Sequence, residues 1–229
     1  MRHAIYYAPE PESLLHELGS TWLGRDAFAG QALRQPDLPG ISDLTEEARR
    51  YGFHATLKPP FALADGMDAA GLVQAMKGLC RTIEPFSIEL KVNVIDGFLA
   101  LVPKTRSARL DALAARCVRE LDSFRRLASE AEVAKRRAAG LTPRQDAHLL
   151  RWGYPYVLED FRFHMTLSRR LGEDEAEALM PAAHAHFADV LQRPVMVGAL
   201  SLFRELSPGQ PFEAIRQFAF TAEPAEARA

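Results

Sequence analysis

The pentapeptide Phe-His-Ala-Thr-Leu occupies residues 53–57, and Phe-His-Met-Thr-Leu occupies residues 163–167. The two stretches differ only at their middle residue, which chance rarely produces in a chain of 229 residues. Histidine is the side chain best suited to transfer protons near neutral pH. A threonine hydroxyl can both donate and accept a hydrogen bond. We therefore expect this repeat to mark the functional site as well as the fold.

The alternation within the first copy predicts a strand with one polar and one apolar face. Side chains at i and i+2 lie on the same face of a strand. His54, Thr56 and Lys58 would therefore share one face, and the opposite face would be apolar. We expect the apolar face to lie against the core and the polar face to meet water or a ligand.

The second copy gives the same pattern, with Arg162, His164, Thr166 and Ser168 on its polar face. The histidines and threonines recur in both copies, whereas the flanking Lys58, Arg162 and Ser168 are assigned by strand parity alone. For these flanking residues, a solvated side chain is the alternative to contact with a ligand.

Hydrophobic periodicity and turn residues predict a mixture of helices and strands. Asp-Gly at residues 96–97, between two apolar segments, is typical of a hairpin turn. The expected helices cover residues 12–28, 45–51, 68–83, a long segment from 107, parts of 131–154, and 174–191. The expected strands cover residues 3–8, 53–58 (stopped by two prolines at 59–60), 86–95, 98–102, 161–168, 195–204 and 212–220.

The order of these elements repeats along the chain and indicates an internal duplication. We expect an α+β protein with two pseudo-symmetric lobes, 1–97 and 98–229, whose antiparallel sheets face a central cleft within one bilobal domain. A polar and basic insertion near residues 127–156 distinguishes the second lobe. This insertion could cover the cleft, but the sequence does not show whether it does.

The composition and charge of the chain exclude some classes of function. The chain is 48% hydrophobic and 25% charged, with a formal net charge of −2, as expected for a soluble globular protein. This charge argues against long nucleic acid as a partner, and a short RNA end stays open. We expect no membrane span, a cytoplasmic location, and reduced, buried thiols at Cys80 and Cys117. Neither motif strand offers a third metal ligand, so no metal or cofactor is expected.

Two histidines around one point suit the opening of a cyclic phosphodiester. One histidine would deprotonate the attacking water, and the other would protonate the leaving oxygen, each contributing about 10²–10⁴-fold. Thr56 and Thr166, with Lys58, Arg162 or Ser168, would bind the phosphate and its developing charge. The sequence does not say which histidine is the base.

The strings HATL at residue 54 and HMTL at residue 164 resemble the two signatures of the two-histidine (2H) phosphoesterase superfamily. Members of that superfamily have two α+β lobes and act on cyclic phosphates without metal. The resemblance implies catalytic roles for His54 and His164 and phosphate-binding roles for Thr56 and Thr166. The longer strings RYGFHATLKPPF and FRFHMTLSRRL resemble a branch of uncharacterised proteins associated with phosphonate metabolism, which implies a ribose cyclic phosphate as a candidate substrate.

Two other functions remain open. One is RNA-end processing, as a 2',3'-cyclic phosphodiesterase or 2'-5' ligase, which the superfamily resemblance also allows. The other is a non-catalytic protein that binds a phosphate or a nucleotide in the same cleft. The presence of two proton-transfer groups favours an enzyme acting on a small cyclic phosphate over this binding protein.

Overall fold

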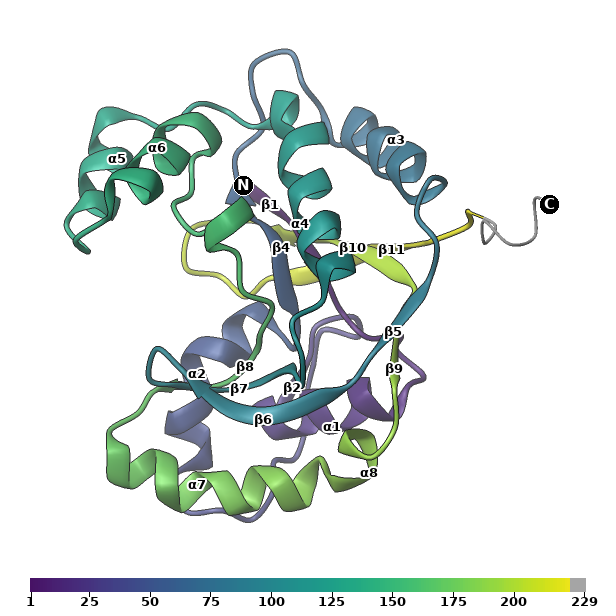
Figure 1. The fold of residues 1–229 in the computed structure, drawn as a ribbon, viewed down its shortest axis with the longest axis vertical. Coiled ribbons are helices and arrows are strands. Elements are labelled where there is room, and N and C mark those ends of the chain that lie inside the picture. Colours follow the sequence, from purple (N-terminus) through teal and green to yellow (C-terminus); the bar gives the residue numbers. More distant parts are fainter. Residues whose placement is uncertain (223–229) are drawn as a thin grey trace.

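Antiparallel strands form one continuous sheet across the middle of the molecule (Figure 1). The computed structural model describes residues 1–222. Within these residues the main sheet has seven strands, in the spatial order β11 (Glu213–Ala219), β10 (Ala199–Glu205), β1 (Arg2–Tyr7), β4 (Ala55–Phe61), β8 (Met165–Arg170), β7 (Phe98–Pro103) and β6 (Leu90–Ile95). The expected α+β class with antiparallel pairing is confirmed.

Two short strand pairs lie outside the main sheet: β2 (Arg25–Asp26) with β3 (Gln31–Ala32), and β5 (Phe86–Ile88) with β9 (Val195–Val197). The helices are α1 (Leu14–Leu23), α2 (Ile41–Tyr51), α3 (Ala69–Cys80), α4 (Ala108–Glu120), α5 (Glu130–Arg137), α6 (Pro143–Trp152), α7 (Glu173–His186) and α8 (Ala188–Leu191). Two 3₁₀ turns complete the described part, η1 (Asp122–Phe124) and η2 (Leu158–Asp160). No helix within residues 1–222 combines the length and the apolar composition that crossing a membrane requires.

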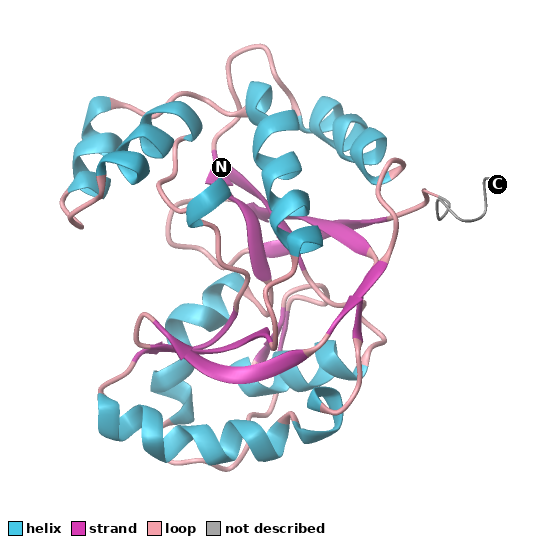
Figure 2. Cartoon of the chain, in the orientation of Figure 1, coloured by secondary structure: helices cyan, strands magenta, loops and turns pink. Residues whose placement is uncertain are grey.

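The helices gather at two ends of the molecule, with the strands between them (Figure 2). Helices α3 and α4 pack on the part of the sheet formed by β11, β10 and β4. Helices α1, α2, α7 and α8 pack on the part formed by β8 and β6. The sheet therefore has two halves that meet where β4 lies beside β8.

Each half of the sheet draws strands from both parts of the chain. The first half joins β1 and β4 to β10 and β11, and the second joins β6 to β7 and β8. The expected boundary after residue 97 falls in the tight turn of the β6–β7 hairpin. The expected lobes 1–97 and 98–229 therefore do not coincide with the two halves of the sheet, and the internal duplication stays a prediction.

The ends of the first helix and of the first motif strand differ from the expected ones. The first helix ends at Leu23 and not near residue 28, because Gly24 adopts a left-handed conformation (φ 78°) and caps the helix. Strand β4 continues through Pro59 and Pro60 to Phe61. Proline lacks the N–H that a central strand needs, but β8 pairs with β4 only at Ala55, so the prolines lie where β4 has a single partner strand.

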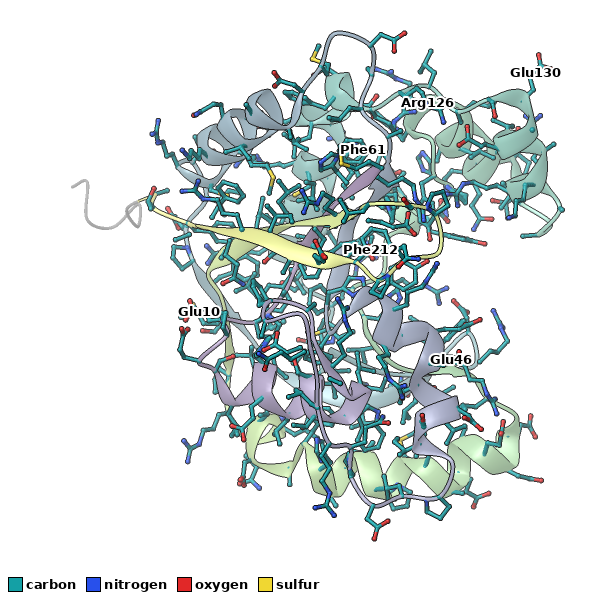
Figure 3. All side chains as sticks on the ribbon, turned by 180° about the vertical axis from the view of Figure 1, so that it is seen from behind. Glu10, Glu46, Phe61, Arg126, Glu130 and Phe212 are labelled. Carbon is teal, nitrogen blue, oxygen red and sulfur yellow. The ribbon has the colours of Figure 1, made fainter. Side chains whose placement is uncertain are left out.

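The expected insertion forms its own small unit of α5 and α6, which stands beside the sheet at the left of the view (Figure 1). Arg126 lies where this unit joins the rest of the chain, and Glu130 lies at its outer end (Figure 3). None of the α5 residues is fully buried. Exposed ion pairs lie on this unit, Arg126–Glu132 at 3.0 Å and Arg137–Asp146 at 2.6 Å, and such pairs contribute little to stability.

Candidate active site

The two repeats meet at their middle residues. Strands β4 and β8 pair antiparallel through Ala55 and Met165, which lie opposite each other. Both residues are buried, as are the apolar residues that alternate with the histidine and threonine of each repeat: Phe53, Leu57, Phe163 and Leu167. Burial of each large apolar side chain contributes about 1.5–3 kcal/mol. The expected assignment of the apolar faces to the core is confirmed.

The pairing of the middle residues places the other residues of the repeats together. Extending the antiparallel register by one residue in each direction puts His54 across from Thr166 and Thr56 across from His164. Residues on the diagonal of such a pair lie roughly 7–8 Å apart, which leaves room for a phosphate group between the two histidines. All four side chains line one cleft of about 420 Å³.

Both histidines are held in the same way. The Nδ1 of His54 lies 2.8 Å from the carbonyl oxygen of Gly52, and the Nδ1 of His164 lies 2.8 Å from that of Arg162. Because a carbonyl only accepts, each Nδ1 carries a proton and donates it. The Nε2 atom of each neutral ring is therefore an acceptor, and for His54 it lies 3.1 Å from the hydroxyl of Thr56.

Burial lowers the pKa of both histidines. For His54 the pKa falls to about 4, because desolvation outweighs the hydrogen bond to Gly52 and the nearby His164 lowers it further. For His164 burial also lowers the pKa, the hydrogen bond to Arg162 raises it, and the charges of Arg162 and Asp96 act in opposite directions. Both rings are therefore neutral at neutral pH.

Two groups outside the repeat fix the ring of His54. Tyr6 on β1 lies opposite Thr56 in the register, and its ring stacks on His54 with 3.8 Å between ring centroids. Gly52 adopts φ 79° and ψ 173°, a region that is essentially restricted to glycine. This conformation aims the Gly52 carbonyl at His54. The register between β1 and β4 that brings Tyr6 to this place is visible only in the structure.

Lys58 does not share the face of His54, and the expectation from strand parity is wrong for this residue. Strand β4 contains a bulge, because Tyr6 lies opposite Thr56 whereas Ile5 lies opposite Lys58. The extra residue reverses the alternation. Lys58 is 1% exposed and donates to the carbonyl of Val118 at 3.1 Å and to Asp122 at 3.2 Å.

Ser168 is displaced by a second bulge, between β8 and β7. Although it borders the cleft, its side chain is 1% exposed. Its hydroxyl accepts from the backbone N–H of Leu99 at 3.0 Å and donates to the carbonyl of Arg169 at 2.7 Å. Ser168 thus satisfies backbone groups that the bulge leaves out of the ladder, and its hydroxyl is not free to bind phosphate.

Arg162 precedes β8, which begins at Met165 and not at residue 161 as expected. Its guanidinium is exposed and forms an ion pair with Asp96. Both residues line a second hollow of about 390 Å³, which shares Thr56 and His164 with the cleft. Arg162 therefore stands beside the site, and its backbone carbonyl is the part that contacts His164.

Residues distant in sequence complete the cleft. Arg2, Tyr51, Arg136 and Tyr154 line it together with the repeat residues. Arg136 and Tyr154 come from the expected insertion, which therefore borders the cleft. Tyrosines near lobe interfaces are usually core residues, and a basic triplet on a helix, such as residues 135–137, is usually solvated. The sequence pattern therefore did not separate these residues from others of their kind.

The other candidate reactive groups lie apart from the cleft. Cys80 and Cys117 are free and buried, as expected. Within the described residues, 1–222, no three side chains of His, Cys, Asp or Glu gather into a group that could hold a metal ion.

The fold and the cleft define an α+β protein with two histidine–threonine pairs facing one cleft. The chain belongs to the family described as "Protein of unknown function (DUF1045)", whose model matches residues 56–213. It is 40% identical over 232 residues to the ribose 1,5-bisphosphate phosphokinase PhnN of Janthinobacterium sp. (strain Marseille), covering 97% of this chain and 51% of that protein. It is 37% identical over 218 residues to the PhnN of Laribacter hongkongensis (strain HLHK9), covering 94% of this chain and 51% of that protein.

The chain thus spans about half the length of the curated relatives that it matches. Among solved structures, it is similar to TT0787 of Thermus thermophilus, with 17% identity, a TM-score of 0.44, and coverage of 98% of this chain and 100% of that one. It is also similar to E. coli LigT complexed with 3'-AMP, with 14% identity, a TM-score of 0.41, and coverage of 96% and 98%.

Proposed function

We propose that this chain is a two-histidine phosphoesterase that hydrolyses a small cyclic phosphodiester of a sugar or nucleotide. The proposal rests on one observation: the Ala55–Met165 pair sets two histidines and two threonines around a single cleft. The identical hydrogen bonds from each Nδ1 support it, because they leave the Nε2 atom of each ring as an unprotonated acceptor on the cleft side, where that of His54 faces the Thr56 hydroxyl. The repeated HATL and HMTL motifs resemble the signatures of that superfamily and support the same assignment.

The reaction would use the two Nε2 atoms in opposite protonation states. One histidine takes a proton from water as the water oxygen bonds to phosphorus. The bond from phosphorus to the ring oxygen breaks, and the other histidine gives its proton to that departing oxygen. The hydroxyls of Thr166 and, after turning away from the His54 Nε2, of Thr56 would donate to the non-bridging oxygens, which carry the developing charge.

The surroundings of the two rings support His54 as the base and His164 as the acid. A base must be unprotonated when the substrate binds, and His54 has a pKa of about 4. An acid must be protonated, and although burial lowers the pKa of His164, its hydrogen bond to the Arg162 carbonyl and, to a smaller extent, the carboxylate of Asp96 raise it. A bound phosphodiester anion would stabilise the protonated form of either ring.

The substrate is proposed to be a ribose cyclic phosphate, in the context of phosphonate breakdown. The name of the relatives, ribose 1,5-bisphosphate phosphokinase, supports a phosphorylated ribose as the kind of ligand. Their kinase activity itself belongs to proteins of about twice this length, and a Walker-type phosphate-binding loop needs a Gly-Lys pair that this sequence lacks. A cytoplasmic location remains a prediction.

A panel of cyclic phosphates tests the function. We expect metal-independent opening of at least one compound among nucleoside 2',3'-cyclic phosphates, ribose 1,2-cyclic phosphate and its 5-phosphate. Turnover is followed by phosphorus NMR, with and without EDTA. Binding without turnover over hours would identify a non-catalytic binding protein instead. Loss of activity in EDTA would point to a metalloenzyme, and a preference for RNA ends that weakens steeply with salt would favour RNA-end processing.

The pH dependence follows from the two lowered pKa values. kcat/KM for the free enzyme requires unprotonated His54 and protonated His164, so it should peak on the acid side of neutrality, above the His54 pKa of about 4 and below the His164 pKa. Above that second pKa it should fall about tenfold per pH unit. Asp96→Asn removes the charge that raises the His164 pKa, so the descending limb should move to lower pH. Profiles of kcat/KM from pH 4 to 9 test this, and a plateau extending above pH 8 would contradict it.

A further inference from the structure

A third cavity, of about 730 Å³, adjoins the histidine cleft on the side of the insertion. The two cavities share the side chains of Arg2, Pro60, Arg136 and Tyr154 as a common wall. One small molecule can therefore reach from the histidines into this hollow. We call it the arginine hollow, lined by Arg2, Arg125, Arg126, Lys135, Arg136 and Tyr154 among others.

Most arginines of the hollow are already paired. Arg126 pairs with Glu132 at 3.0 Å, and Arg125 pairs with Asp122 at 2.8 Å. The Nε of Arg2 lies 2.6 Å from the buried carboxylate of Glu205. These contacts fix the walls of the hollow, and they leave the terminal guanidinium nitrogens of Arg2 without a hydrogen bond within residues 1–222.

Arg136 differs from these arginines because it has no ion pair or side-chain hydrogen bond within the described residues. It is half-buried, and its guanidinium lies 4.9 Å from the ring centroid of Tyr154. Its neighbour Arg137 turns outward to Asp146 at 2.6 Å. The aromatic contact holds Arg136 between the two cavities while its five N–H groups remain available.

We propose that the arginine hollow binds a second phosphate of the substrate, a phosphomonoester at the end remote from the cyclic phosphate, with Arg136 as the residue that selects for it. A guanidinium without a partner in a cavity is suited to a phosphomonoester, which it can bind with two parallel hydrogen bonds. The inference rests on the proposed function, since it names the substrate class of the same cleft. The formal net charge of −2 argues against a long RNA chain as the substrate.

Turnover of matched substrates tests the selectivity. A nucleoside 2',3'-cyclic phosphate and its 5'-phosphorylated form differ only in the remote phosphate, as do ribose 1,2-cyclic phosphate and its 5-phosphate. We expect the wild-type protein to prefer the phosphorylated member of a pair. Arg136→Gln should lower the ratio of the two kcat/KM values by about ten- to hundredfold, as expected for one charged hydrogen-bonding group. Arg137→Gln removes the same charge from the same helix and should leave the ratio unchanged.

Equal kcat/KM values for both members in the wild-type protein would overturn the inference and leave the proposed function intact. A ratio that Arg136→Gln does not change would overturn the role of Arg136. A stronger preference for a dinucleotide ending in a 2',3'-cyclic phosphate would also overturn it, because the hollow would then accept the phosphodiester of an RNA chain.

Binding provides a test that does not depend on turnover. By calorimetry, ribose 1,5-bisphosphate should bind the wild-type protein more tightly than ribose 1-phosphate does, and Arg136→Gln should abolish most of that difference. If no cyclic phosphate is hydrolysed and the difference is still found, the proposed function fails and the second phosphate site stands. Equal affinity of the two compounds would overturn the site whatever the turnover results.

Discussion

Replacing either His54 or His164 with alanine is expected to lower kcat/KM for cyclic phosphate hydrolysis by about 10²–10⁴-fold. Each ring supplies one of the two proton transfers through its Nε2 atom, because the Nδ1 proton is held by a backbone carbonyl. Because the two groups act in one step, the kcat/KM of the double variant should be only slightly below that of the less active single variant. The measurement is steady-state hydrolysis of the best substrate of the cyclic phosphate panel.

The control must separate lost chemistry from lost structure. His184→Ala makes the same change at an exposed position of α7 and should leave activity unchanged. His54→Asn keeps a hydrogen-bonding group beneath Tyr6 and should remain inactive with little change in thermal stability. Full activity in either alanine variant would refute acid–base catalysis by these residues. Inactive variants that still bind substrate with unchanged affinity would support it most directly.

Gly52→Ala is expected to reduce both stability and activity. The backbone of Gly52 has φ 79°, where an L side chain is strained at a cost of about 1–3 kcal/mol. A Cβ there would also lie 2.5 Å from the Cβ of Ala27, closer than two carbon atoms can approach. Relief of that overlap would move the carbonyl that holds the Nδ1 proton of His54, so kcat should fall even in the fraction that folds.

Gly140→Ala is the matched control for this prediction. Gly140 has a similar φ of 75°, but nothing lies within 4 Å of the position of its Cβ. This variant should show the backbone strain alone and retain activity. Urea denaturation measures the free energy of unfolding, and kcat at saturating substrate measures the effect on His54. Equal losses of stability in the two variants, with full activity in both, would show that the Gly52 carbonyl does not position the histidine.

Much of the fold followed from short-range patterns. Helices were expected in every region where the structure has an α-helix, because amphipathic spacing and capping residues act within a few turns. The ends were less accurate, as the early stop of the first helix at Gly24 shows. The order of the strands could not be predicted from the sequence. Strand β10 pairs with β1 from almost the opposite end of the chain, and β11 pairs with β10.

The candidate site was also predicted only in part from the sequence. The alternation of the repeats correctly predicted buried apolar faces. The same alternation failed one step beyond the repeats, at Lys58 and Ser168, because both motif strands contain a bulge there. A bulge depends on how the neighbouring strand pairs, so it cannot be predicted from the alternation of residues along one strand.

The sequence by itself determined which residues repeat and which face of each strand is apolar, because alternation is a property of the strand alone. Only the tertiary structure decided that Ala55 and Met165 lie opposite each other and so bring the two histidines into one cleft. It also decided that Tyr6 stacks on His54 and that Arg136 alone of the basic triplet 135–137 borders the cleft. These contacts join distant segments, and their geometry depends on sheet register and helix packing that involve the whole chain.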